Sequence, residues 1–94
     1  MVKYQLITIV EPIKSGEIRI EWESTEVLSI CKYTRDLDPE SAVVIDYMSI
    51  GEIMLMGWEE FLEHVDEVIA GLEYEKIRIT KEVGEFFNCP LRVY

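Results

Sequence analysis

One segment of this chain, residues 58–72, has the residue spacing of an amphipathic helix. Its apolar residues recur at intervals of three and four positions: Trp58, Phe61, Leu62, Val65, Val68, Ile69 and Leu72. This spacing places them along one side of an α-helix, and Gly71 is a typical residue near a helix end. Because this is the one clear helical pattern in the chain, most of the remaining core must come from β-strands.

The rest of the sequence is dominated by strand patterns. We expect strands at residues 4–13, 17–23, 26–34, 42–48, 53–56 and 75–81, with a last strand carrying Phe87, Cys89 and Leu91. The Asp-Pro-Glu-Ser segment at 38–41 could begin a helix, but the β-branched run that follows it favours a strand. The sequence therefore predicts an α+β fold, with a mostly antiparallel, flat or curled sheet of about five to seven strands and one helix at about 58–72.

Two hairpins are expected in this sheet. Residues 14–16, Lys-Ser-Gly, form the first turn, between a central strand that is apolar on both faces and residues 17–23. The strict alternation of residues 17–23 predicts Ile18, Ile20 and Trp22 facing the core and the charges facing solvent. In the second hairpin, residues 82–84 form the loop, and Pro90 indicates an edge position for the last strand.

The predicted sheet is wider than its helix. About six strands at about 4.8 Å spacing span nearly 30 Å, whereas one helix covers about 10 Å. Several strands are apolar on both faces, so one helix cannot cover them all. We therefore expect the sheet to curl around the helix, or a second copy or a partner protein to cover the remainder.

Chain length and composition indicate a single domain over residues 1–94. No apolar run is long enough to span a membrane, and the N-terminal residues lack signal-peptide features, so we expect a cytoplasmic location. Cys31 and Cys89 are more typical of buried thiols than of a disulfide. Glutamate contributes 15 residues and isoleucine 12, whereas asparagine and glutamine together contribute two, a skew that is common in thermophilic proteins.

Negative charge is the least ordinary feature of the composition. The formal net charge is −10, and residues 36–75 contain 12 of the 19 acidic residues and none of the nine Lys and Arg. Such a field repels phosphate backbones, which disfavours direct binding of nucleic acid. The basic residues do not form a cluster in the sequence, because glutamates are interleaved with them.

The predicted helix carries a row of carboxylates opposite its apolar side: Glu59, Glu60, Glu63, Asp66 and Glu67. Successive acids near the middle of this row lie about 4.5 and 6 Å apart along the axis, which is comparable to phosphate spacing in a nucleic-acid strand. The row could therefore occupy the nucleic-acid groove of another protein. The alternative is a solvated face that keeps the chain soluble.

His64 is the only histidine in the chain. Glu60, His64 and Glu67 lie at helical spacing and are weak candidate ligands for a metal ion. Any glutamate-rich helix produces such a trio by chance, so the alternative is a histidine that flanks the apolar stripe. We expect no cofactor.

Two apolar segments are candidate partner-binding surfaces. Residues 48–58 contain three of the four methionines, including Met54 and Met56, and methionine adapts well to irregular partner surfaces. Phe86 and Phe87 are neighbours, so in a strand one of them faces away from the core. Packing inside the core is the alternative for both segments.

The sequence contains no Gly-rich phosphate loop, no His-Glu-x-x-His helix, no Gly-x-Ser-x-Gly turn and no Cys-x-x-Cys pair. We therefore expect a non-enzymatic protein-interaction module, self-associating as a homodimer through apolar sheet surface. The alternative is an acidic inhibitor, of the kind that viruses and plasmids encode, which mimics nucleic acid and blocks a DNA- or RNA-binding protein. A metal-dependent activity at His64 is a third hypothesis.

Overall fold

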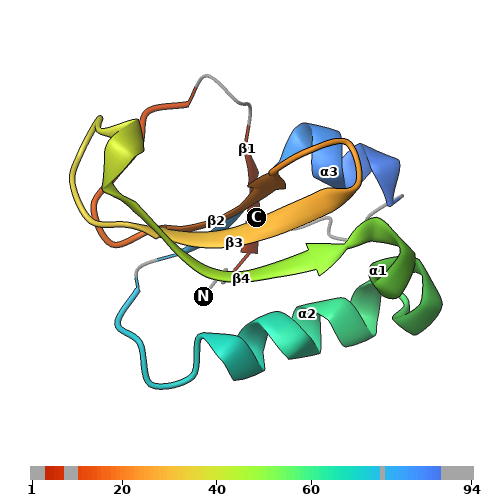
Figure 1. The fold of residues 1–94 in the computed structure, drawn as a ribbon. Helices are drawn as coiled ribbons and strands as arrows, with labels where there is room; N and C mark the ends of the chain where they lie inside the picture. The colour runs from red at the N-terminus through yellow and green to blue at the C-terminus, as the bar shows by residue number, and fades with distance from the viewer. Residues whose placement is uncertain (1–3, 8–10, 75, 88–94) are drawn as a thin grey trace.

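The computed structural model describes residues 4–7, 11–74 and 76–87 (Figure 1). Its strands are β1 (Tyr4–Ile7), β2 (Ile18–Trp22), β3 (Val27–Tyr33), β4 (Ala42–Ser49) and β5 (Ile77–Thr80). Its helices are the short 3₁₀ helix η1 (Pro39–Ser41) and the α-helices α1 (Ile50–Met56), α2 (Trp58–Val68) and α3 (Lys81–Phe86). The α+β class is confirmed. None of these helices has the length and apolar composition that crossing a bilayer requires.

The sheet is mixed, with strand order β1-β5-β2-β3-β4. β5 pairs in parallel with both β1 and β2, whereas β2, β3 and β4 are antiparallel neighbours. The prediction of a mostly antiparallel sheet with a single helix was therefore wrong in detail. Strand patterns can indicate which face of a strand is buried, but they do not reveal its neighbours. The long connection through α1 and α2 returns the chain to a position between β1 and β2.

The first predicted hairpin does not exist, because β5 lies between the two strands that it was to join. β1 is at one end of the strand order rather than at its centre. Gly16 does adopt the positive φ of a turn, at 86°. However, its N–H donates to the carbonyl of Tyr33 at 2.8 Å, so this turn connects to β3 rather than reversing the chain onto β1.

The strands predicted at 17–23, 26–34, 42–48 and 75–81 are confirmed as β2, β3, β4 and β5. Residues 38–41 were considered as a helix start or as the approach to a strand, and both structures form, one after the other. Asp38 accepts a hydrogen bond from the backbone N–H of Glu40 at 2.9 Å and caps the single turn η1. The β-branched run then continues as β4.

The strand predicted at 53–56 is helix α1. Ser49 caps this helix by accepting the N–H of Glu52 at 3.2 Å, and its hydroxyl lies 3.3 Å from the Glu52 carboxylate. Ser-x-x-Glu is the sequence of a capping box, which outweighed the local preference for strand. Gly57, at φ 90°, ends α1 and directly precedes α2.

The loop predicted at residues 82–84 is part of helix α3. Val83, Phe86 and Phe87 have the i, i+3, i+4 spacing of one helix face, and Val83 is buried in the core. The predicted last strand therefore does not begin at Phe87, which is the C-cap of α3. Cys89, Pro90 and Leu91 lie outside the described residues.

The core lies between α2 and one face of the sheet (Figure 1). Phe61, Val65 and Ile69 from the predicted apolar stripe are fully buried. The strands contribute alternate residues to this layer: Ile18, Ile20, Leu28, Ile30, Ile77 and Ile79. α2 ends at Val68, earlier than the predicted 72, with Gly71 at φ 87° beyond it. Leu72 is consequently exposed.

We predict that Ile53→Ala lowers the free energy of unfolding by about 2–4 kcal/mol, because this α1 side chain is fully buried. Leu55→Ala is the matched control, since Leu55 is on the same helix and 91% exposed. It should change stability by less than about 0.5 kcal/mol. Urea unfolding measures both, and equal losses would show that α1 does not pack as described.

Candidate functional site

An apolar groove lies between α1, the start of α2 and α3. Its lining consists of Ile53, Met54, Gly57, Trp58, Phe86 and Phe87, and its volume is about 340 Å³. We call it the α1–α3 groove. No side chain in this lining ionises near neutral pH. The groove can therefore bury an apolar group, but its walls offer no acid, base or nucleophile.

Two features of the chain path bring these residues together. Gly57 allows α2 to begin directly after α1, which places Trp58 beside Ile53 and Met54. α3 follows β5 without a loop and lies at the same end of the sheet as α1 (Figure 1). Residues separated by about 30 positions thus line one groove.

Aromatic rings form one side of the α1–α3 groove. The rings of Trp58 and Phe87 stack with centroids 5.4 Å apart, and Phe87 meets Phe86 edge-on at 4.8 Å. Phe86 also contacts the edge of Trp22 at 5.3 Å. Offset and edge-on contacts of this kind stabilise aromatic pairs beyond the area they bury, so these rings stabilise one another's positions.

Large apolar side chains are exposed beside the groove. Met54 is 65% exposed, Leu55 91% and Phe86 53%. A second hollow of about 490 Å³ continues on the far side of Phe86, where Trp22, Glu23, Ser24 and Thr25 line it. Contiguous exposed apolar surface of this kind is typical of interaction sites.

The structure places three of the four predicted apolar residues in this groove. Met54, Phe86 and Phe87 line it, whereas Met56 packs partly against the core. All four are on or next to helices, not on the sheet as expected. Of the phenylalanine pair, Phe86 is the exposed member and Phe87 is half-buried.

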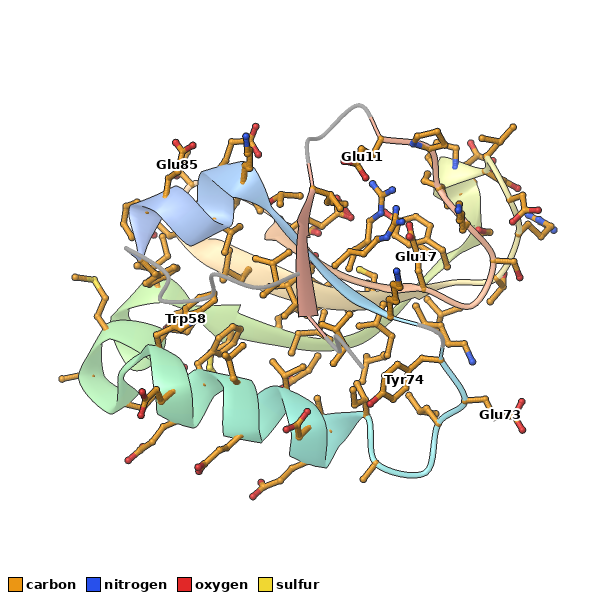
Figure 2. All side chains as sticks on the ribbon, turned by 180° about the vertical axis from the view of Figure 1, so that it is seen from behind. Glu11, Glu17, Trp58, Glu73, Tyr74 and Glu85 are labelled. Carbon is orange, nitrogen blue, oxygen red and sulfur yellow. The ribbon has the colours of Figure 1, made fainter. Side chains whose placement is uncertain are left out.

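Trp58 has an unpartnered polar group next to the groove. Its side chain is buried (Figure 2), and its indole Nε1 is inaccessible to solvent and has no hydrogen-bond partner within the described part of the chain. Buried N–H groups are rarely left unpaired, because the lost hydrogen bond to water is not replaced. A partner molecule could supply the missing acceptor only if the side chains that cover this N–H shifted.

The predicted acidic row lies on a different surface. Glu59, Glu60, Glu63 and Glu67 are exposed on α2, while Asp66 is partly buried. Figure 2 shows the acidic side chains of α2 pointing away from the sheet. No Lys or Arg occurs in α2, so these carboxylates form a negative ridge along the helix.

His64 contacts the sheet instead of its helical neighbours. Its Nε2 lies 2.8 Å from Oδ2 of Asp46, whose Oδ1 accepts the N–H of Tyr47 at 2.9 Å. Among the described residues, no three His, Cys, Asp or Glu side chains are grouped to hold a metal ion. Asp46 lies on β4, the last strand in the order, next to a β-bulge. A charged side chain and a bulge both discourage another strand from pairing with β4.

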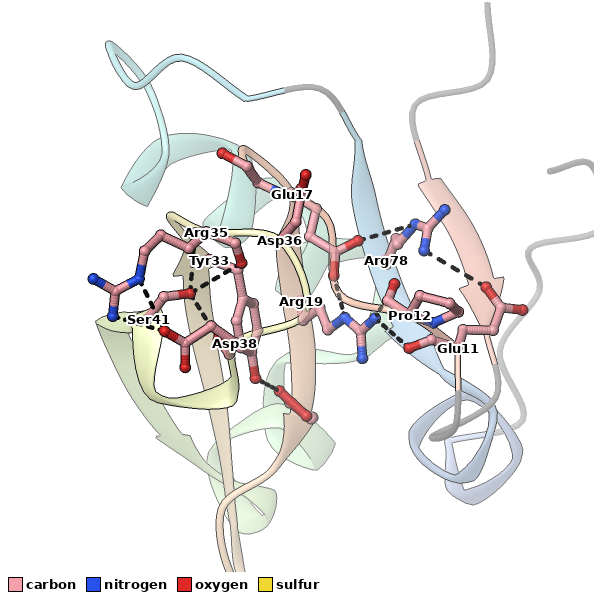
Figure 3. Close-up of polar contacts among 12 residues, drawn as sticks. Glu11, Pro12, Glu17, Arg19, Tyr33, Arg35, Asp36, Asp38, Ser41 and Arg78 are labelled. Carbon is pink, nitrogen blue, oxygen red and sulfur yellow. Dashed lines mark hydrogen bonds and ion pairs between the residues drawn. The ribbon is translucent and has the colours of Figure 1, made fainter.

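A buried ion cluster was missed by the sequence reasoning. The charges of residues 17–23 were expected to face solvent, yet Glu17 is 1% and Arg19 3% exposed. Figure 3 shows Arg19 Nε donating to Glu17, while its Nη2 donates to the carbonyls of Glu11 at 2.9 Å and Pro12 at 3.1 Å. Arg78 from β5 lies 3.2 Å from Glu17 and 3.6 Å from Glu11.

The cluster lies on the sheet face opposite α2, at β2 and β5, and alternation alone could not reveal that this part of the face is buried. Next to it, Tyr33 donates to the Glu21 carboxylate at 2.6 Å and lies under Arg19. Burial raises the pKa of Tyr33, and the hydrogen bond to Glu21 raises it further. Burial likewise raises the pKa of the Cys31 thiol, so this thiol is unreactive at neutral pH. These paired groups stabilise the fold rather than offering a reactive site.

The sequence did contain signals for the two helices of the groove, α1 and α3, which were not predicted. The Ser49 to Glu52 capping box predicts α1, and the 83, 86, 87 spacing predicts α3. Ile53 and Trp58 were already within the candidate segment 48–58, but no local signal placed this segment beside Phe86 and Phe87. No sequence signal identifies the contact between Trp22 and Phe86, because it depends on the strand order.

We predict that Arg19→Met lowers the free energy of unfolding by about 3–5 kcal/mol. The substitution leaves the Glu17 carboxylate buried with Arg78 as its remaining ion-pair partner. The control is Arg35→Met, which breaks the exposed pair with Asp38 and should cost less than about 1 kcal/mol. Chemical denaturation compares the two variants, and similar losses would contradict the buried assignment.

Comparison of the chain with protein-family models finds no match. Comparisons with curated proteins and with solved structures find no match either. The function of the α1–α3 groove must therefore be inferred from its contacts, burial and charge.

Proposed function

We propose that this chain is a non-enzymatic protein-interaction module whose binding surface is the α1–α3 groove. The observation that carries this proposal is the exposure of Met54, Leu55 and Phe86 around an apolar hollow. Such a surface gains free energy when another polypeptide removes it from water. A binding role also agrees with the expected class of function.

The distribution of ionisable groups supports binding over catalysis. The groove lining has no titratable side chain, whereas general acid–base or nucleophilic chemistry needs such a group within hydrogen-bond reach of the substrate. The buried charged groups pair with one another on the opposite face of the sheet. His64 pairs with Asp46.

The position of Leu55 supports self-association. This protruding side chain lies on α1, the helix that also forms one wall of the groove. Two copies related by a two-fold axis could each place Leu55 in the groove of the other, which is the self-complementary geometry of a homodimer. Repulsion between two chains of charge −10 opposes this contact, so the proposed dimer is weak.

We predict a reversible monomer–dimer equilibrium at tens of micromolar in sedimentation equilibrium. Raising the salt from about 0.05 to about 0.5 M should strengthen the dimer, because salt screens the like charges. Leu55→Glu should weaken it at least about tenfold, since it removes an apolar contact and adds charge.

Val43→Glu is the matched control, because Val43 is also an exposed apolar residue but lies on β4. A wild-type chain that stays monomeric at every salt concentration would contradict self-association. Equal weakening by Val43→Glu would move the interface away from the groove.

The acidic ridge of α2 supports a second candidate function, the blocking of a nucleic-acid-binding protein by mimicry of phosphates. Glu60, Glu63 and Glu67 are exposed and rise along the helix in steps of about 4.5 and 6 Å. This spacing supports competition with a phosphate backbone for a basic groove. The dimer proposal does not require the acidic ridge.

The mimicry candidate predicts a specific loss on neutralising the ridge. Host proteins that bind heparin, which are enriched in nucleic-acid-binding proteins, are passed over the immobilised chain. Salt-sensitive retention should fall at least about tenfold for the variant Glu60→Gln, Glu63→Gln, Glu67→Gln.

The control variant Glu26→Gln, Glu40→Gln, Glu73→Gln makes the same change of charge at exposed positions outside α2. If both triple variants lose retention equally, the binding depends on net charge alone. If wild type retains no protein, the mimicry candidate fails.

A further inference from the structure

We propose that the cognate occupant of the α1–α3 groove is a cationic amphipathic segment of another protein, with a bulky apolar anchor between Lys or Arg residues. This inference rests on the proposed function, because it names the partner class for the same groove. Three independent features of the site carry it: the charge around the groove, the shape and chemistry of its lining, and an unpaired hydrogen-bond donor.

The elements that surround the groove are strongly acidic. α1, α2 and α3 together carry eight carboxylates and a single lysine, Lys81. Glu52, Glu59, Glu82 and Glu85 on these elements are all exposed, and Glu23 lines the adjoining hollow. An apolar centre with an anionic surround attracts a ligand of opposite charge and the same apolar pattern.

The lining of the groove suits a large, flexible apolar anchor. Trp58 and Phe87 present stacked rings, and Met54 provides an adaptable wall. A helical segment that places apolar residues at i, i+4 and i+7 can lay this face into a groove of such a kind. Continuation of the apolar surface past Phe86 toward Trp22 gives room for a second anchor.

The indole N–H of Trp58 needs an acceptor. It is buried and unpaired within the described residues, whereas tryptophan N–H groups at interfaces usually have a partner. A backbone carbonyl or side-chain oxygen of the occupant could pair with it only after the surrounding side chains shift and expose it. This donor distinguishes specific occupancy from non-specific apolar contact.

Charge also ranks the possible occupants. A second copy brings another −10 to an acidic surface, and an anionic lipid surface is repelled in the same way. A cationic segment instead neutralises the surrounding carboxylates. It would therefore displace the weak dimer rather than add to it.

The test uses three fluorescent peptides with the same apolar residues at i, i+4 and i+7 and with Lys, Gln or Glu elsewhere. Fluorescence anisotropy with the full chain should show the Lys peptide binding at least about tenfold more tightly than the Gln peptide at low salt. The advantage should shrink as salt is raised to about 0.5 M. The Glu peptide should bind most weakly.

Variants separate the contributions. Met54→Asp should weaken both the Lys and the Gln peptide, whereas Glu82→Gln with Glu85→Gln should weaken the Lys peptide alone. Glu63→Gln with Glu67→Gln is the matched control on α2, away from the groove, and should have the smaller effect. Trp58→Phe keeps an aromatic ring but removes the N–H, and should weaken the Lys peptide about fivefold, with urea unfolding verifying that the variant is folded.

Each contrary outcome has a distinct meaning. Equal binding of the Lys and Gln peptides overturns the cationic partner but leaves the groove as an interaction site. Self-association without peptide binding assigns the groove to a second copy and also overturns this inference. Binding that is lost in the α2 variant but kept in Met54→Asp places the partner on the acidic ridge. The absence of both peptide binding and self-association overturns the inference and the proposed function together.

Discussion

β5 lies between β1 and β2, and its pairing with both strands determines the positions of all the features that matter for function. On one face it places Ile77 and Ile79 under α2, where they complete the core. On the other face it places Arg78 beside Glu17 and Arg19, where the three side chains form a buried ion cluster. At its end the chain continues directly into α3, which forms one wall of the α1–α3 groove. Without this insertion the groove would not exist.

The two faces of the sheet are therefore closed in different ways. α2 covers one face with apolar contacts, whereas the other face buries charged side chains that form ion pairs with one another. Burying an ion cluster costs desolvation free energy that its contacts must offset. This second closure covers part of the sheet surface on which the expectation of self-association was based. Exposed apolar side chains remain on β4, and others lie at the end of the sheet on α1 and α3.

Local patterns in the sequence predicted the fold class, the strands β3, β4 and β5, and the buried face of α2, because each depends on periodicity within one segment. They did not predict the strand order, because the pairing of β5 depends on contacts between distant segments. α1 and α3 were missed for a different reason: their capping box and apolar spacing were present, but short β-branched and methionine-rich runs favour strand and helix similarly. Met54, Phe86 and Phe87 were identified as candidates without the helices that hold them, whereas Trp58 was assigned both to the candidate segment 48–58 and to the apolar stripe of the predicted helix.

The most direct test of the groove as the interaction site is residue-resolved NMR. ¹H–¹⁵N spectra of the isotopically labelled chain would be recorded over a concentration series and then with the cationic peptide. The account predicts shifts confined to the amides of α1 and α3 and to the indole N–H of Trp58, which should move downfield as it gains an acceptor. Shifts confined to the acidic face of α2 or to β4, with the Trp58 indole unchanged, would contradict it.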